Sequence, residues 1–261
     1  MLKLDAYKLK WIAIIAMFFN HAVIALWDLF PHATRFPLYA VGGITFPVMA
    51  YFVVEGYKHT RSLGRYVLRI LIVGLIALPF HILALGVPLG GGNPFLYPWL
   101  NIMFAIALSI GVLVMYDKIK YRAIFWILFV LIIVPVSFLF FEYYFAGVLM
   151  VLLFHIIKNE TARRIVPPVV NAVLFTVLAL MAGSMPVPEG TEGLIVNPDL
   201  APVMLTFGIG SLIAAYLLAG YNGQRGRKMK WLFYVFYPLH FVVLAGIALA
   251  LGYIDLSVFG M

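Results

Sequence analysis

Residues 11–29 read WIAIIAMFFNHAVIALWDL, an apolar run that is interrupted by Asn20 and His21. About 20 apolar residues are enough to cross the hydrocarbon core of a bilayer as an α-helix. Comparable runs recur along the 261-residue chain, which is 65% hydrophobic and only 11% charged, with a mean hydropathy of +1.06. This pattern predicts an all-α, polytopic integral membrane protein, that is, a helical bundle in the bilayer.

Other fold classes fit the chain poorly. A transmembrane β-barrel would show short alternating segments, whereas residues 121–141, YRAIFWILFVLIIVPVSFLFF, have no period of two. No polar stretch is long enough for a separate soluble domain, so residues 1–261 are expected to form a single transmembrane domain. The basic head MLKLDAYKLK resembles the start of a signal peptide, but no small-residue cleavage site closes the following run. We expect this run to be a retained first helix.

The breaks between apolar runs predict about nine transmembrane helices. Their approximate bounds are 9–29, 38–57, 66–86, 96–116, 123–141, 143–157, 165–183, 200–221 and 230–252. The division between the fifth and the sixth is the least marked, so counts of eight and ten stay open.

The basic residues test this count independently, because Lys and Arg collect in cytoplasmic connections. With nine helices, 17 of the 18 Lys and Arg residues fall on one side, and only Arg35 falls on the other. The N-terminus is therefore expected in the cytoplasm. The net charge of +8 is explained by this topology, so nucleic-acid binding is not expected.

Asn20 and His21 are the intramembrane polar residues that most need a function. Steps of three and four residues from His21 reach Met17 and Ile24, and this helix face must contact protein or a water-filled cavity. An imidazole can take a proton from a nucleophile near neutral pH, and an adjacent carboxamide can orient the site or stabilise an oxyanion. The alternative is a buried histidine that is only hydrogen-bonded to a neighbouring helix.

A second polar group lies at the cytoplasmic end of the second predicted helix. Glu55 shares a helix face with Lys58 and His59, so the simplest expectation is an ion pair with one of them. The alternative is that Glu55 belongs to the functional site. Lys58, Arg61 and Arg65 belong to a basic run at the membrane surface. Topology or contact with anionic lipid headgroups explains such a run, and a polyanionic cytoplasmic cofactor is the sharper hypothesis.

The last helix contributes His240, one turn after Tyr237 and at a depth similar to that of His21. The two histidines are therefore expected to approach one another. A haem held between them is conceivable, but no helix carries paired histidines, and no metal is expected. Two further residues are candidates for the functional site. Arg35 is the only basic residue on the outer side, and Asn101 lies near the outer end of the fourth helix.

Six segments occur in an order that resembles the TraX family, which is named for the conjugative pilin acetylation protein. They are LKWIAIIAMFFNHA, GGITFPVMAYFVVEGYKHTRS, RYVLRILIVGLIALPFHIL, NIMFAIALSIGVL, YYFAGVLMVLLFHIIK and WLFYVFYPLHFVVL, and the similarity extends over most of the chain. The most specific residues are Phe46, Pro47, Glu55, Gly56, His59, Thr60 and Arg61, with the YPLH of Tyr237 to His240.

The resemblance implies a multi-pass acetyltransferase of the bacterial cytoplasmic membrane, similar to the broader group of transmembrane acyltransferases. Such a protein would move an acetyl group from cytoplasmic acetyl-CoA to an amine or hydroxyl acceptor at or across the membrane. His21 would be the general base, with Asn20 and Glu55 as the other catalytic residues. Cations would bind the phosphates of acetyl-CoA, namely Lys58, His59, Arg61 and Arg65. The residues assigned to substrate binding are Arg35, Asn101, Tyr237 and His240.

Two positions depart from the family pattern. Asp often stands immediately before the first-helix histidine, where this chain has Asn20, so a carboxylate that would orient His21 is missing. Arg often precedes the apolar residue before the FP pair, where this chain has Gly43. Either the site is assembled differently or the acceptor differs.

The acceptor stays open among an envelope glycan, a lipid and a protein N-terminus, and membrane lipids are the other expected partners. The competing hypothesis is a proton-coupled transporter or a lipid-handling protein without covalent chemistry. In that case His21, Glu55 and His240 would relay protons or contact the substrate. Cysteine is absent, which excludes transfer through a protein thiol.

Overall fold

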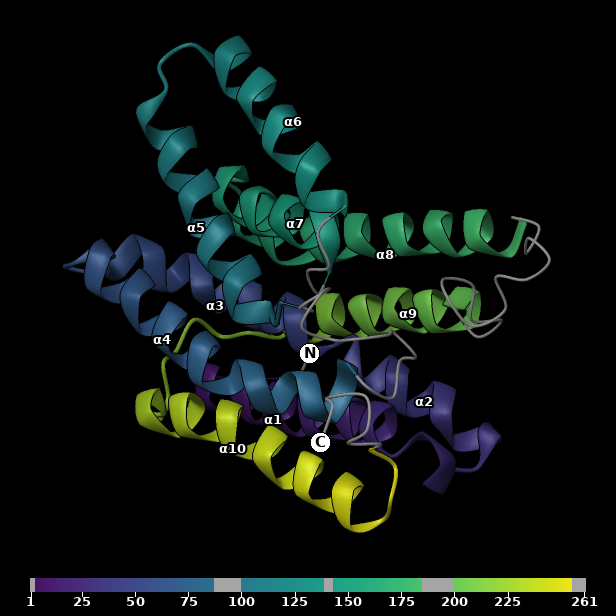
Figure 1. Ribbon diagram of the computed structural model, residues 1–261. Helices are drawn as coiled ribbons and strands as arrows, with labels where there is room; N and C mark the ends of the chain where they lie inside the picture. Colours follow the sequence, from purple (N-terminus) through teal and green to yellow (C-terminus); the bar gives the residue numbers. More distant parts are fainter. Residues whose placement is uncertain (1–2, 87–99, 139–142, 185–199, 255–261) are drawn as a thin grey trace.

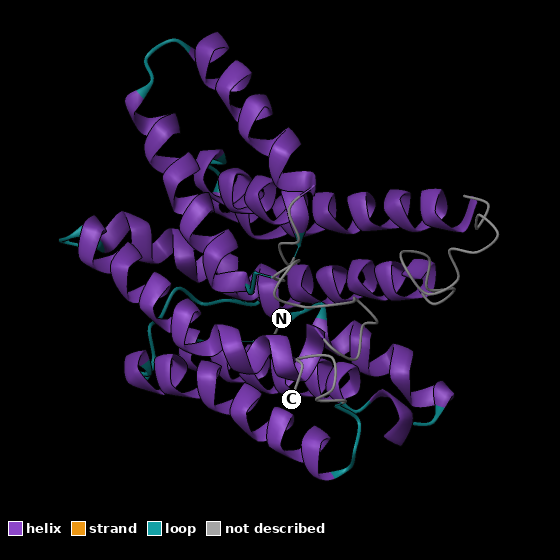
Figure 2. Ribbon diagram, viewed as in Figure 1, coloured by secondary structure: helices purple, strands orange, loops and turns teal. Residues whose placement is uncertain are grey.

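The computed structural model describes residues 3–86, 100–138, 143–184 and 200–254, and its regular elements within these ranges are helices (Figure 1 and Figure 2). They are α1 (Ala6–Ala25), α2 (His32–Gly42), α3 (Thr45–His59), α4 (Leu63–His81), α5 (Ile102–Lys118), α6 (Arg122–Phe138), α7 (Tyr144–Ile156), α8 (Glu160–Ser184), α9 (Leu200–Ala219) and α10 (Lys230–Ala250). A 3₁₀ turn (Trp27–Leu29) follows α1, and a π-helical turn (Ile82–Gly86) extends α4.

The expected class of helical membrane protein is confirmed. The helices α2 and α3 form one bent span, so the described residues contain nine helical spans, as predicted. Six of these spans are long and apolar enough to cross a membrane.

The predicted second helix, 38–57, is wrong in its bounds and in its continuity. The span formed by α2 and α3 begins at His32 and ends at His59, with a break between Gly42 and Thr45. Pro47 follows the break and has no N–H to donate to residue 43, so the helical ladder loses a hydrogen bond there. The predicted helices 96–116 and 123–141 extend partly outside the described residues.

The helices pack as two groups that contact one another through α3, through α2 with α9, and through α4 with α5 (Figure 1). In one group, α1 contacts α2, α3 and α10, and α10 also packs on α4. In the other, α7 contacts α3, α5 and α8, while α8 and α9 lie side by side and extend to the right of the view. The α3–α4 turn and the α9–α10 connection lie at the left, which is the cytoplasmic end by the charge distribution.

The bend between α2 and α3 is also where α9 approaches most closely. A Cβ atom built on Gly210 of α9 would lie 2.2 Å from the carbonyl oxygen of Ala40 and 2.6 Å from the Cα of Gly43. Only glycine fits at such a distance, and small residues are the usual means of bringing transmembrane helices together. Gly210 therefore lets the α8–α9 pair dock against the bend.

At the cytoplasmic end, the N-terminal residues are fastened to the α9–α10 connection. Leu4 N donates to Gly220 O at 3.0 Å, and Asn222 N donates to Leu4 O at 2.9 Å. Asp5 then caps α1 by accepting a hydrogen bond from Lys8 N at 2.8 Å. A capping carboxylate of this kind satisfies one of the free N–H groups at a helix start.

Candidate functional site

A cavity of about 230 Å³ lies inside the bundle. Its wall is built mainly by α1, α2, α3, α5, α8, α9 and α10, with His81 at the end of α4. Asn20, His21 and Tyr237 face it, whereas no Asp, Glu, Lys or Arg is among the described residues that line it. The cavity is therefore apolar apart from a few uncharged polar groups.

On α1 and α9 the cavity lies toward the outer end, and on α10 it extends to Phe233 and Tyr237, in the half of that helix nearer the cytoplasm. On α1 the lining residues run from Met17 to Ile24, in the second half of the helix, and on α9 they run from Val203 to Phe207, just after its outer end. His21 lies four residues before the end of α1. It is therefore nearer the outer end than the sequence bounds of 9–29 predicted.

His21 and His240 meet at this cavity, as their similar depths predicted. His21 Nδ1 lies 2.8 Å from His240 Nε2, and the ring planes differ by 16°. On the other side of its ring, His240 Nδ1 donates to the carbonyl oxygen of Phe236 at 3.1 Å. Both histidines are buried. His21 lines the cavity and His240 stands behind it.

Asn20 brings a hydrogen-bond donor to the same wall. Its side chain is only 6% exposed, and its amide Nδ2 has no hydrogen-bond partner among the described residues. A buried donor without a partner is rare, because the desolvation cost of the group is not offset. A donor that faces a cavity in this way is suited to bind an oxygen atom of a ligand.

The haem hypothesis does not fit this geometry. Metal–nitrogen bonds to histidine are about 2.0–2.1 Å, so two histidine nitrogens on opposite sides of one metal lie about 4 Å apart. The His21–His240 separation of 2.8 Å leaves no space for an iron atom between them. Elsewhere in the described part of the chain, no group of three His, Cys, Asp or Glu side chains is placed to hold a metal.

Two residues that the sequence assigned to substrate binding have structural partners instead. Asn101 is fully buried at the start of α5, where Oδ1 accepts from Met103 N at 3.1 Å and Nδ2 donates to Gly74 O at 2.9 Å. Arg35 donates from Nε to Phe30 O at 2.8 Å, and its guanidinium lies 4.4 Å from the centre of the Trp27 ring. Neither residue lines the cavity, so their contact with substrate stays a prediction.

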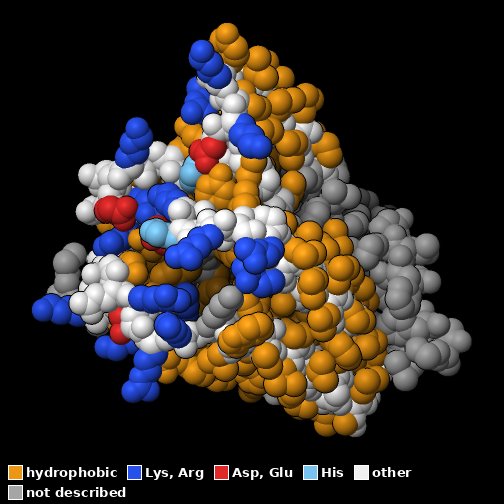
Figure 3. Space-filling view, turned by 90° about the vertical axis from the view of Figure 1, so that its left-hand side faces the viewer, with side chains coloured by type: hydrophobic (Ala, Val, Ile, Leu, Met, Phe, Trp, Pro, Cys, Tyr) orange, Lys and Arg blue, Asp and Glu red, His pale blue; other side chains and the backbone are white. Residues whose placement is uncertain are grey.

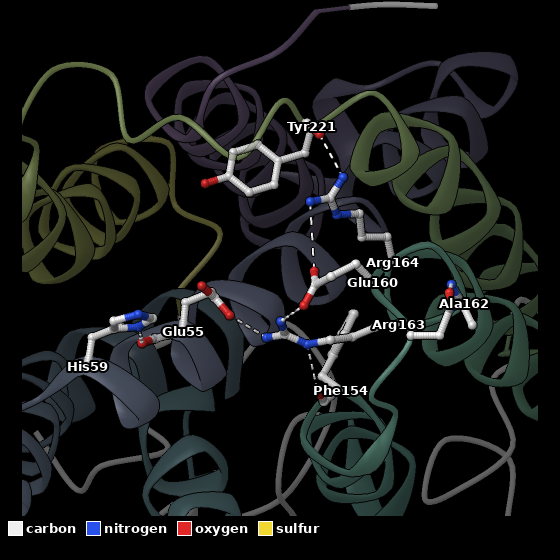
Figure 4. Close-up of polar contacts among 9 residues, drawn as sticks. Glu55, His59, Phe154, Glu160, Ala162, Arg163, Arg164 and Tyr221 are labelled. Atoms are coloured by element: carbon white, nitrogen blue, oxygen red, sulfur yellow. Dashed lines mark hydrogen bonds and ion pairs between the residues drawn. The ribbon is translucent and has the colours of Figure 1, made fainter.

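Glu55 pairs with Arg163 of α8, and the expected pairing with Lys58 or His59 is wrong (Figure 4). Arg163 is buried; its Nε donates to Phe154 O at 2.7 Å and its Nη1 donates to Glu160 at 3.0 Å. His59 instead donates from Nδ1 to the backbone oxygen of Glu55 at 2.8 Å. The buried guanidinium attracts Glu55 because unpaired buried charge is costly.

This cluster joins the cytoplasmic ends of α3, α7 and α8 and lies apart from the cavity. Met49 is the last residue of α3 that lines the cavity, and Glu55 lies six residues further, which is about 9 Å along a helix. A second arginine, Arg164, donates to Tyr221 O at 2.8 Å and extends the network to the α9–α10 connection (Figure 4). The direct catalytic role predicted for Glu55 has no geometric support.

Lys and Arg side chains gather over the cytoplasmic end of the molecule (Figure 3). Lys58, His59, Arg61 and Arg65, the predicted cation set, are all exposed around the α3–α4 turn. In the described part of the chain, neither Arg61 nor Arg65 has an ion pair. These charges are therefore available to an anionic molecule from the cytoplasm.

The sequence profile of the TraX protein family matches residues 6–248, which is nearly the whole chain. This chain belongs to the TraX family. One relative, described as a probable fimbrial assembly protein FimC, serogroup H1, of Dichelobacter nodosus, is 28% identical over 255 residues, with 92% of this chain and 94% of that protein covered. No solved structure matches the chain.

The two most specific TraX-like segments are divided between the cavity and the cytoplasmic cluster. In the first, Phe46 lines the cavity and Glu55 holds Arg163. In the second, Tyr237 lines the cavity and His240 contacts His21. The TraX pattern therefore follows the cavity wall and the salt-bridged end of the same bundle.

The sequence-based site missed two residues of the TraX cavity. His81 is fully buried and lines it from the end of α4; its position as an ionisable group in an apolar run was the available signal. Tyr143 lines it from the turn before α7, with a left-handed backbone (φ 64°) and its ring 4.4 Å from that of Phe46. Nothing in the sequence pattern marks that conformation.

Proposed function

We propose that this TraX-family chain is an integral membrane acetyltransferase of the bacterial cytoplasmic membrane. It moves an acetyl group from cytoplasmic acetyl-CoA to an amine or hydroxyl acceptor. The observation that carries the proposal is the pair formed by His21 and Asn20, a hydrogen-bonded imidazole and an amide donor without a partner on one cavity wall. Acyl transfer requires a general base and a hydrogen-bond donor that stabilises the oxyanion, and His21 and Asn20 are suited to these two roles.

In this proposal the amine nitrogen or hydroxyl oxygen of the acceptor attacks the thioester carbonyl, and His21 takes the proton that this atom loses. The Asn20 amide donates to the oxyanion of the tetrahedral intermediate. When the carbon–sulfur bond breaks, His21 returns the proton to the departing thiolate. The products are the acetylated acceptor and free CoA, so no protein-bound acetyl group is needed. An acetyl-His21 intermediate is the alternative route.

The donor is bound from the cytoplasmic end. Lys58, His59, Arg61 and Arg65 are exposed there, and the exposed arginines are free to contact phosphate oxygens. His21 lies eleven residues beyond Lys10 on α1, which is about 16 Å along the helix axis. The thioester must therefore extend well into the bundle, and the apolar cavity around His21 excludes the charged part of the donor.

The acceptor reaches His21 from the outer end. A charged group would find no counter-ion in the cavity lining, so the nucleophile reacts as an uncharged amine or hydroxyl. An acceptor rich in hydroxyls, such as a sugar ring, would leave most of them without partners there, which favours a lipid or a protein N-terminus over an envelope glycan. The relative described as a probable fimbrial assembly protein supports a protein acceptor.

Purified protein in lipid nanodiscs tests the proposal in two steps. CoA and acetyl-CoA at saturating concentration should raise its unfolding temperature, because a ligand that binds only the folded state stabilises it. Membranes that contain the chain should then incorporate labelled acetyl groups from acetyl-CoA, and membranes without it should not. A chain that neither binds CoA nor transfers the label would support the transporter or lipid-handling hypothesis.

A further inference from the structure

The second contact of the His240 ring, with the carbonyl oxygen of Phe236, determines which histidine donates the hydrogen bond between His21 and His240. His240 Nδ1 lies 3.1 Å from the carbonyl oxygen of Phe236. Because a carbonyl oxygen can only accept a hydrogen bond, the single hydrogen of a neutral His240 ring is on Nδ1. His240 Nε2 then carries the lone pair, and it can only accept.

Both rings are neutral at rest. His21 is 6% exposed and His240 is 3% exposed, and no carboxylate contacts either ring in the described part of the chain. A buried charge without a partner is strongly unfavourable. The other titratable groups around the pair are His81 of α4, whose ring lies 5.0 Å from that of Phe241, and Tyr237 of α10, whose ring lies 5.6 Å from that of His240.

The hydrogen of this bond therefore comes from His21 Nδ1, which donates to His240 Nε2 at 2.8 Å. The ring planes differ by only 16°, and the ring centroids are 5.0 Å apart. Two imidazole rings whose nitrogens are 2.8 Å apart reach a centroid separation of 5.0 Å only when both nitrogens lie close to the line between the ring centres. The two nearly parallel rings are therefore also nearly coplanar. This in-plane geometry directs the N–H at the lone pair.

We propose that His240 is a positioning residue that holds His21 in the Nδ1–H tautomer and leaves the His21 Nε2 lone pair to act as the base. This inference rests on the proposed function, in which His21 takes the acceptor proton. His21 lines the cavity and His240 does not. His240 therefore acts through His21, and the substrate contact that the sequence assigned to it is replaced by this role.

The arrangement also accounts for Asn20. In a Ser-His-Asp triad, a carboxylate holds the catalytic imidazole in the required tautomer and stabilises its protonated form. Here the residue before His21 is an amide and cannot supply that charge, but His240 Nε2 already accepts from His21 Nδ1. After His21 Nε2 takes the proton, its Nδ1–H keeps the same bond, and His240 does not change its own protonation. Asn20 is left free to donate to the oxyanion.

The tautomer is measured without any transfer assay. In nanodiscs that contain ¹⁵N-histidine-labelled protein, with His21→Asn used for assignment, the His21 signals should show Nδ1 protonated and Nε2 unprotonated. In His240→Phe, which keeps the ring shape but removes the acceptor, Nε2–H should become populated. A wild-type His21 that carries its hydrogen on Nε2 would overturn the inference.

Kinetics separate positioning from substrate contact. We expect His240→Phe to lower kcat by roughly 10- to 1,000-fold, with KM for acetyl-CoA and acceptor changed less than about twofold. His240→Gln, whose Oε1 can accept from His21 Nδ1, should recover most of kcat. Phe241→Leu, which alters packing against both rings and keeps the hydrogen bond, is the matched control. A large rise in KM with unchanged kcat would contradict the positioning role.

The acetyltransferase activity and the positioning role of His240 can be disproved independently. If wild-type protein transfers no acetyl group but its His21 is in the Nδ1–H tautomer, the acetyltransferase proposal fails and the tautomer assignment stands. If transfer depends on His21 while His240→Phe and His240→Gln both keep full kcat, the acetyltransferase proposal stands and the positioning role fails.

Discussion

The side chain of Asn20 occupies the space where a side chain on Gly42 would begin. A Cβ built on Gly42 would lie 2.3 Å from both the Cβ and the Nδ2 of Asn20, far inside any real contact distance. The absence of a side chain at Gly42, the last residue of α2, therefore gives Asn20 its place on the cavity wall. This single position links the bend of the α2–α3 span to the candidate site.

Gly42→Ala should therefore disturb both stability and function. The added methyl overlaps Asn20 Cβ as well as its amide, so a rotamer change cannot relieve the clash, and overpacking of this kind costs about 1–3 kcal/mol. We expect a lower unfolding temperature and reduced transfer. The double variant Asn20→Gly with Gly42→Ala should be more stable than the sum of the single variants predicts, and strict additivity would contradict the contact.

Asn20 itself should act through its amide donor. Removal of one oxyanion donor typically lowers kcat by about 100- to 1,000-fold, so we expect that range for Asn20→Ala. Asn20→Asp should be at least as impaired, because a carboxylate would lie beside the developing negative charge. Single-turnover transfer rates measure both variants. If Asn20→Asp were more active than the wild type, the residue would orient His21 as a carboxylate, contrary to this account.

Glu55 should matter for stability more than for chemistry. Removal of one partner of a fully buried ion pair destabilises a protein by about 3–5 kcal/mol, and the cost here should be smaller because the Glu55 side chain is 30% exposed and Glu160 also contacts Arg163. Glu55→Gln should lower the unfolding temperature in detergent while the folded fraction keeps its kcat. Lys118→Gln, at an exposed position at the same end of the molecule, is the control. A folded Glu55→Gln protein without transfer would restore the catalytic role that the sequence predicted.

Arg61 and Arg65 should determine the affinity for the donor. Each arginine-to-glutamine variant is expected to raise KM for acetyl-CoA roughly 3- to 10-fold with little change in kcat, and added salt should reduce the difference by screening exposed charges. Lys228→Gln, an exposed cation on the α9–α10 connection, serves as control. Equal effects of all three substitutions would mean that the site attracts anions only through its general charge.

The topology could be predicted because it depends on local features of the sequence, namely the lengths of the apolar runs and the positions of the charged residues between them. Helix length and the alternate placement of Lys and Arg predicted the nine spans and isolated Arg35 on the outer side. The approach of His21 to His240 followed from equal depth on two helices, although 219 residues separate them. In each case the bilayer fixes the depth of a residue from its position along its own helix.

What the sequence could not predict depends on which helices are neighbours. The pairing of Glu55 with Arg163 joins residues 108 positions apart, and the local spacing favoured Lys58 or His59 instead. The left-handed backbone of Tyr143 and the close approach of Gly210 to the α2–α3 bend likewise arise from packing. The sequence also did not predict that Asn101 caps α5.

The most direct test of the account is acetyl transfer by His21→Ala that is inserted and folded in normal amounts. The measurement is incorporation of labelled acetyl groups from acetyl-CoA, with CoA-induced stabilisation as a check on donor binding and His32→Ala, exposed near the outer end, as the control. We predict a loss of roughly 100-fold or more in the transfer rate, with donor binding retained. Transfer by His21→Ala at a rate close to that of the wild type would contradict it.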